Sequence, residues 1–110
     1  MALEIGTIMV GAYHYASRHP YWYVVKEISP SRKTCIVHRV KDCVVSHDCY
    51  GQNGTMTCYL VDGKPIEDEY YRDVRCTLKE YEDGSVYVNH KKFRIYLSAW
   101  DGTPEDFFTD

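Results

Sequence analysis

Short runs of apolar residues, alternating with polar ones or continuous, recur along the chain between turn-forming residues. Runs such as "YWYVVKEIS", "TCIVHRV" and "FRIYLSAW" are rich in β-branched and aromatic side chains, which is typical of β-strands. Turns divide them: "SPSRK" places Pro30 at the second position of a turn, and "QNGT", "VDGK" and "EDGS" carry Asn-Gly or Asp-Gly pairs suited to two-residue hairpins. The spacing predicts a mainly β fold, a small antiparallel barrel or curled sheet of six to eight strands, with an open α+β sheet as the alternative.

Two stretches depart from this rhythm. In "KPIEDEYYRDVRC" apolar residues recur at four-residue spacing, at Ile66, Tyr70 and Val74. A proline at the start, acids in the opening turn and arginines near the end suit the helix dipole, so we expect a short helix at about 65–75. The tail "GTPEDFFTD" repeats the start signal, with Thr103 as cap, and predicts a single helical turn.

The aromatic side chains gather in "YHYASRHPYWY", residues 13–23, which holds four tyrosines, a tryptophan and two histidines. On a strand, Tyr21 and Tyr23 point to one face and Trp22 to the other. Both faces are aromatic or apolar, so we expect at least one of them to be core. The alternative is a functional aromatic patch, formed by Tyr13, Tyr15, Tyr21 and Trp22. Tyrosine is enriched both at protein interfaces and on platforms that stack single-stranded nucleic acid.

Composition places the chain among ordinary globular domains. Its 110 residues predict one domain, residues 1–110, long enough to bury a core without metals or disulfides. No apolar run is long enough to span a membrane, and no basic region precedes an apolar stretch near the start, so we expect a protein of the cytoplasm. Five cysteines, an odd number without a CxxC pair, indicate reduced thiols.

Charge is unevenly distributed along the chain. Residues 1–61 hold six basic and four acidic side chains, whereas residues 62–110 hold seven basic and twelve acidic ones. The first part therefore has a net charge of +2 and the second of −5, which together give the overall −3. This asymmetry argues against a nucleic-acid binder that uses its whole surface, and it favours a partner that is itself basic.

The cysteines raise two possibilities for chemistry. If Asn53 and Gly54 form a two-residue turn, Cys49 lies directly opposite Cys58, and the two could form a strained, easily reduced disulfide or remain buried thiols. Cys43 and His47 share the face of Cys49, but the tight CxxC knuckles of structural zinc sites are missing, so we expect neither metal nor cofactor. No GxSxG, HExxH, Walker or GxGxxG motif occurs, and we do not expect an enzyme or any catalytic residue.

Two stretches resemble a known group of sequences. "GTIMVGAYHYASRHPYWYVVKEIS" is similar to the beginning, and "WDGTPEDFF" to the Trp-Asp-Gly-x-Pro-x-x-Phe close, of small uncharacterised proteins from phages, plasmids and other mobile elements of Gram-positive bacteria. The matching positions are Gly6, Ile8, Tyr13, Tyr15, Trp22, Tyr23, Val24, Val25, Lys26, Trp100, Asp101, Gly102, Pro104 and Phe107. The resemblance covers about a third of the chain. It implies no activity or cofactor, but a genomic neighbourhood in which small proteins often inhibit host defence, including CRISPR nucleases.

These observations favour a non-enzymatic protein–protein binding module of a mobile element, acting in the bacterial cytoplasm on a protein or ribonucleoprotein with a basic surface. The acids would give complementarity and the aromatic residues would give anchors. The expected partner-binding residues are Glu67, Asp68, Glu69, Tyr70, Tyr71, Trp100, Asp101, Glu105, Asp106 and Phe107.

Three further options stay open at this point. The first is binding of single-stranded nucleic acid through Tyr13, Tyr15, Arg18, Tyr21, Trp22, Arg32 and Lys33. The second is a thiol redox sensor that uses Cys49 and Cys58. The third concerns assembly, because an exposed β edge can pair with a second copy to make a homodimer.

Overall fold

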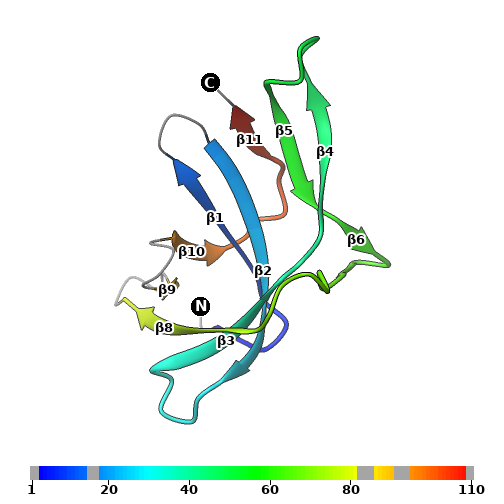
Figure 1. Ribbon diagram of the computed structural model, residues 1–110. Coiled ribbons are helices and arrows are strands. Elements are labelled where there is room, and N and C mark those ends of the chain that lie inside the picture. Colours follow the sequence, from blue (N-terminus) through cyan, green and yellow to red (C-terminus); the bar gives the residue numbers. More distant parts are fainter. Residues whose placement is uncertain (1–2, 15–17, 82–85, 91–94, 109–110) are drawn as a thin grey trace.

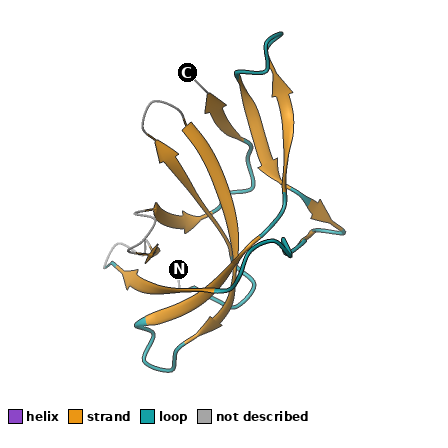
Figure 2. Ribbon diagram, in the orientation of Figure 1, coloured by secondary structure: helices purple, strands orange, loops and turns teal. Residues whose placement is uncertain are grey.

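The computed structural model describes residues 3–14, 18–81, 86–90 and 95–108. Its strands are β1 (Ile8–His14), β2 (Arg18–Ile28), β3 (Thr34–Arg39), β4 (Asp42–His47), β5 (Asn53–Cys58), β6 (Leu60–Val61), β7 (Lys64–Pro65), β8 (Val74–Glu80), β9 (Val86–His90), β10 (Ile95–Ala99) and β11 (Glu105–Phe108) (Figure 1). These residues form no helix, and so none long and apolar enough to cross a membrane (Figure 2). The prediction of a mainly β fold is confirmed.

Six of the strands close into an antiparallel barrel. Hydrogen-bonded neighbours follow the order β1-β10-β9-β8-β3-β2, and β1 pairs again with β2 to complete the circle. Beyond β2 the same sheet continues through β11 and β5 to β4, which forms its edge, while β6 and β7 make a separate hairpin. The expected small barrel is therefore present, and the open α+β alternative is wrong.

A large hydrophobic cluster fills the barrel. Each of the six barrel strands contributes to it, and its buried members are Leu3, Met9, Val25, Cys35, Val37, Cys76, Leu78, Val88 and Leu97. Alternation along each strand points these side chains to the same side of the sheet, where removal from water stabilises the closed form. Tyr23 packs against this cluster from a half-buried position.

A second cluster lies on the opposite face of β2. Its buried members are Val10, Trp22, Val40, Met56 and Cys58, and half-buried Ile8, Val24, Trp100 and Phe107 pack against them. Strand β2 thus uses both of its faces, with Val25 in the barrel and Trp22 in the outer cluster. The prediction that at least one face is core is confirmed. The Trp22 side chain has an exposed fraction of 0%, so it is a core residue and not an exposed stacking residue.

The predicted helix at about 65–75 is wrong. Pro65 ends β7, and the backbone of the following residues pairs with the end of β3: Lys41 N–H donates to the Ile66 carbonyl at 2.8 Å and Asp68 N–H to the Arg39 carbonyl at 2.9 Å. The four-residue spacing does not mark an apolar stripe either, because Tyr70 is 95% exposed. Tertiary hydrogen bonding to an open strand edge therefore outweighs a weak local preference for helix.

The predicted helical turn in the tail is also wrong. Asp101 accepts hydrogen bonds at its Oδ1 from the backbone N–H of Thr103 at 2.9 Å and from the Thr103 hydroxyl at 2.6 Å, and this local turn redirects the chain. The next residues form β11, in which Glu105 pairs with Met56 of β5. Thr103 thus lies in a turn between two strands and does not cap a helix.

The hairpin between β4 and β5 does not turn at Asn53 and Gly54. Asp48 organises the turn instead, since its carboxylate accepts the backbone N–H groups of Tyr50 at 3.1 Å and Gln52 at 3.0 Å. Gly54 lies within β5, opposite His47, beside the irregularity between Val44 and Ser46 of β4. A Cβ atom at Gly54 would lie 1.9 Å from the Ser46 carbonyl oxygen. Glycine is therefore required here, because the two backbones approach too closely for a side chain.

Two of the other predicted turns are confirmed. Asp62 and Gly63 join β6 to β7 with positive φ angles of 53° and 77°, as a two-residue hairpin of type I′ requires. Arg32 N–H donates to the Ser29 carbonyl at 2.9 Å, which places Pro30 at the second turn position. The predicted turn at residues 82–85 lies outside the described residues.

Candidate binding surface around segment 66–73

Segment 66–73, which connects β7 to β8, lies along the last residues of β3. Strand β8 pairs with β3 only as far as Val37. Beyond that point segment 66–73 takes over the edge, with a β-bridge between Val40 and Glu67 in addition to the backbone hydrogen bonds described above. Because successive side chains of a strand point to opposite faces, His38 and Arg39 emerge on the two sides of this junction.

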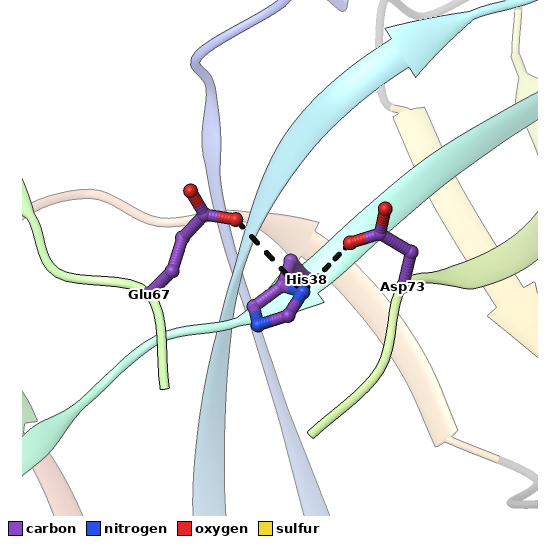
Figure 3. A group of neighbouring side chains, drawn as sticks. All are labelled: His38, Glu67 and Asp73. Carbon is purple, nitrogen blue, oxygen red and sulfur yellow. Dashed lines mark hydrogen bonds and ion pairs between the residues drawn. The ribbon is translucent and has the colours of Figure 1, made fainter. Parts of the chain in front are cut away.

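On one face, His38 connects β3 to both ends of the segment (Figure 3). Its Nδ1 lies 2.7 Å from Asp73 Oδ1, and its Nε2 lies 2.9 Å from the backbone carbonyl oxygen of Asp68. Glu67 Oε1 approaches the same Nδ1 at 3.8 Å. His38 is buried, with an exposed fraction of 9% for the whole residue. Both nitrogens face acceptors, so the protonated imidazole can donate a hydrogen bond from each of them.

Lys26 of β2 completes this charged group. Its Nζ lies 2.9 Å from Glu67 Oε1 and 3.5 Å from Asp73 Oδ1. Burial lowers the pKa of His38, but the hydrogen bonds to the Asp68 carbonyl and the Asp73 carboxylate outweigh it, and the net direction is upward. The hydrogen bond that Asp73 accepts from His38 lowers the pKa of Asp73. The hydrogen bond that Lys26 donates to Glu67 raises the pKa of Lys26. When His38 is protonated, the group contains two cations and two acids.

On the other face, Arg39 lies between two tyrosine rings. The guanidinium carbon is 4.2 Å from the ring centre of Tyr21 on β2 and 4.3 Å from that of Tyr71 in the segment. The His19 ring stacks on Tyr21, with ring centres 4.5 Å apart and an angle of 26° between the planes. We call His19, Tyr21, Arg39 and Tyr71 the stacked row. Cation–π contacts of this kind attach the segment to the barrel from the side opposite to His38.

Between these two attachments the segment makes a tight turn, in which Tyr70 is the more exposed ring, at 95% against 43% for Tyr71. Tyr71 N–H donates to the Asp68 carbonyl at 3.2 Å, and Tyr70 N–H donates to the Asp68 carboxylate at 3.1 Å. Glu69 and Tyr70 occupy the centre of the turn; Glu69 is exposed and Tyr70 is 95% exposed. A large aromatic side chain thus projects into solvent from a backbone that is fixed on both sides.

The other half of the predicted partner-binding set has a different setting. Trp100 meets Trp22 edge to face in the outer cluster, with ring centres 6.1 Å apart, and its Nε1–H donates to the Thr103 carbonyl at 2.8 Å. Phe107 is half-buried against the same cluster. Both pack half-buried against the outer cluster and do not project into solvent as Tyr70 does, and their role as partner-binding anchors stays a prediction. The acids here are occupied or peripheral: Asp101 holds the local turn, Glu105 pairs with Arg18 at 3.7 Å, and Asp106 is exposed.

The structure does not assemble the residues proposed for nucleic-acid binding into one groove. Trp22 is buried, and Arg18 is engaged by Glu105 and by the Asp106 carbonyl. Arg32 forms an ion pair with Glu80, and it lies with Lys33 in the turn after β2, whereas Arg18 lies at the start of that strand. Tyr21 belongs to the stacked row. The Tyr13 side chain and the whole of Tyr15 lie outside the described residues.

The strand register that would place Cys49 opposite Cys58 is wrong. Cys58 is buried opposite Asp42, and Cys49 is exposed in the turn organised by Asp48, so the two do not form a cross-strand pair. Cys43 pairs with Thr57 and His47 with Gly54, and the four residues considered for zinc do not come together as a group of metal ligands among the described residues. In the described part of the chain, the group with the spacing of metal ligands is a different one, formed by His38, Glu67 and Asp73.

Sequence reasoning found Glu67–Tyr71 but missed the residues that hold this segment. His38, Arg39, Lys26 and Asp73 belong to no short motif, because their contacts join strands distant in the sequence. The signal that was available is the alternation in "HRVK" on a predicted strand, which places His38 and Arg39 on opposite faces. Comparisons with models of protein families, with curated proteins and with solved structures found no match for this chain.

Proposed function

We propose that the chain is a non-enzymatic protein–protein binding module that presents Tyr70 and Glu69 to a basic surface of a protein or ribonucleoprotein. One observation carries the proposal: a tyrosine that is 95% exposed stands on a tight turn held from both faces of β3. Exposed aromatic residues on preorganised backbone are favourable anchors, because little conformational entropy is lost when a partner encloses them.

The charges around the turn support a basic partner, but fewer acids are free to attract it than the sequence suggested. Glu67 is engaged by Lys26, and one oxygen of Asp68 accepts the Tyr70 N–H, so both acids also maintain the turn. Glu69 is exposed at the centre of the turn, beside Tyr70. We therefore assign the long-range attraction mainly to Glu69 and the contact energy to Tyr70.

The biological setting follows the resemblance to small mobile-element proteins. In that setting the module acts in the cytoplasm of a bacterial host and occupies a surface that its target needs. Inhibition of a host-defence nuclease, such as a CRISPR nuclease, is the most specific form of the proposal. A large basic surface that binds nucleic acid is the kind of target that an exposed acid and a protruding tyrosine would fit.

The test is a tagged pull-down from bacterial lysate, with and without nuclease, using wild type, Tyr70→Ser and Glu69→Lys. Tyr96→Ser is the matched control, because Tyr96 is 64% exposed on β10. We expect a basic partner that survives nuclease treatment and is retained by Tyr96→Ser. Tyr70→Ser should weaken its binding by about 30-fold, as expected for an anchor that contributes about 2 kcal/mol, and Glu69→Lys should mainly slow association.

Two outcomes would contradict the proposal. A partner that binds Tyr70→Ser as tightly as wild type would show that the turn is not the binding element. Enrichment that disappears with nuclease would favour the single-stranded nucleic-acid alternative, with the stacked row as the remaining platform.

A further inference from the structure

Three side chains bring potential metal-ligand atoms to one point on the face of β3 that carries His38. His38 Nδ1, Asp73 Oδ1 and Glu67 Oε1 all lie within 4.8 Å of one another. The nitrogen is 2.7 Å from Asp73 Oδ1 and 3.8 Å from Glu67 Oε1. In an octahedral site with metal–ligand bonds of roughly 2.1 Å, neighbouring ligand atoms are roughly 3 Å apart. The distance from Nδ1 to Asp73 is slightly shorter than this, and the distance from Nδ1 to Glu67 is longer.

The histidine is oriented as a metal ligand would be. Its Nε2 faces the Asp68 carbonyl oxygen at 2.9 Å. A metal-binding histidine commonly donates its other ring N–H to such an acceptor, which fixes the tautomer and leaves the lone pair on the ligating nitrogen. When His38 donates from Nε2 to the Asp68 carbonyl and is neutral, the lone pair lies on Nδ1, which faces both carboxylates (Figure 3). Burial of the side chain holds the ring in this orientation.

A cation already occupies this position. Two carboxylates converge here, and the ammonium group of Lys26 lies within 3.5 Å of both. The Lys26 side chain is 38% exposed and is long and flexible, so its charged end can move into water without losing hydration. A divalent ion would bring two charges and direct coordination to a place where the ammonium brings one charge and hydrogen bonds.

We propose that His38, Glu67 and Asp73 form a binding site for a divalent cation of the Mn²⁺ class, for which Lys26 is the built-in competitor. One nitrogen and two carboxylate oxygens suit Mn²⁺ or Fe²⁺, and water would complete the coordination, because the Glu67 and Asp73 side chains are 48% and 51% exposed. The ion would connect β3 to both ends of segment 66–73. This site does not depend on the proposed partner.

The test is titration with MnCl₂ at pH 8, followed by the electron paramagnetic resonance signal of free Mn²⁺. A basic pH is used because Nδ1 must be unprotonated to coordinate, and Mn²⁺ is used because it prefers oxygen ligands and leaves the cysteines aside. We expect one bound ion per chain. Asp73→Asn and Glu67→Gln should each weaken binding at least tenfold.

The variant Lys26→Met distinguishes this site from non-specific binding to surface acids. It removes the competing ammonium and should tighten Mn²⁺ binding several-fold, whereas Lys79→Met, at an exposed lysine of β8, should change it little. All these substitutions lie at exposed side chains, and far-ultraviolet circular dichroism confirms folding of each variant. Absence of binding at millimolar Mn²⁺ in both wild type and Lys26→Met would overturn the proposal. Equal affinity of wild type and Asp73→Asn would overturn it too.

Discussion

Replacing Arg39 with methionine tests whether the stacked row holds the candidate surface in place. Methionine keeps the length and apolar stem of the side chain but removes the guanidinium that lies 4.2 Å and 4.3 Å from the two tyrosine ring centres. Each cation–π contact at a partly exposed ring contributes about 0.5–1 kcal/mol, so the loss of both costs about 1–2 kcal/mol. With a urea m-value of about 1.5 kcal/mol/M, the unfolding midpoint should fall by roughly 1 M.

A double-mutant cycle isolates the contact that matters for segment 66–73. Arg39→Met, Tyr71→Leu and the double variant are unfolded in urea, and the coupling between the two positions should be about 0.5–1 kcal/mol. Arg72→Met is the control, because Arg72 is an exposed arginine of the same segment. A coupling indistinguishable from zero, or an equal loss in Arg72→Met, would refute the inference that Arg39 attaches the segment through Tyr71.

Two further predictions concern the fold around this surface. Gly54→Ala should cost about 3 kcal/mol, the upper end for inserted atoms, because the new Cβ would lie 1.9 Å from the Ser46 carbonyl oxygen; a loss below about 1 kcal/mol in urea unfolding would contradict the close approach. Burial raises the pKa of Asp42, and Arg39 only partly opposes it, so ionised Asp42 opposes folding at pH 7 and ceases to do so below its unfolded pKa of about 3.9. Asp42→Asn should therefore raise the unfolding temperature at pH 7 and leave it almost unchanged at pH 3, and a lower unfolding temperature at pH 7 would contradict this.

The strands were predictable because their signal is local. Alternation and β-branched runs mark β2 and β3 in the sequence, and Asp62-Gly63 marks a hairpin. Closure of the barrel was not determined by such signals, since the pairing of β1 with both β10 and β2 joins residues distant in the chain. The helix predicted at about 65–75 failed for the same reason. Its local sequence signals were present, but the backbone of these residues forms hydrogen bonds with the open edge of β3, and a local sequence pattern cannot predict such distant partners.

The candidate site was predictable only in part. Acids interleaved with aromatic residues identified Glu67–Tyr71, because composition is visible in a short window. That composition could not separate Tyr70, which projects into solvent, from Trp100 and Phe107, which pack against the outer cluster. Whether an aromatic residue is an anchor or a core residue depends on what the rest of the chain places over it.

The position of segment 66–73 meets a requirement of the sheet as well as the proposed function. Where β8 leaves β3, the backbone groups of Arg39 and Lys41 would form an open edge, and open edges invite pairing with other chains. The segment forms hydrogen bonds with those backbone groups. Because His38 and Arg39 point to opposite faces of β3, they hold the segment from both sides. A loop held this firmly can display a tyrosine in one orientation, so the contacts that protect the edge also preorganise Tyr70. It follows that substitutions of His38 or Arg39 should weaken partner binding through the segment even though neither residue needs to touch the partner.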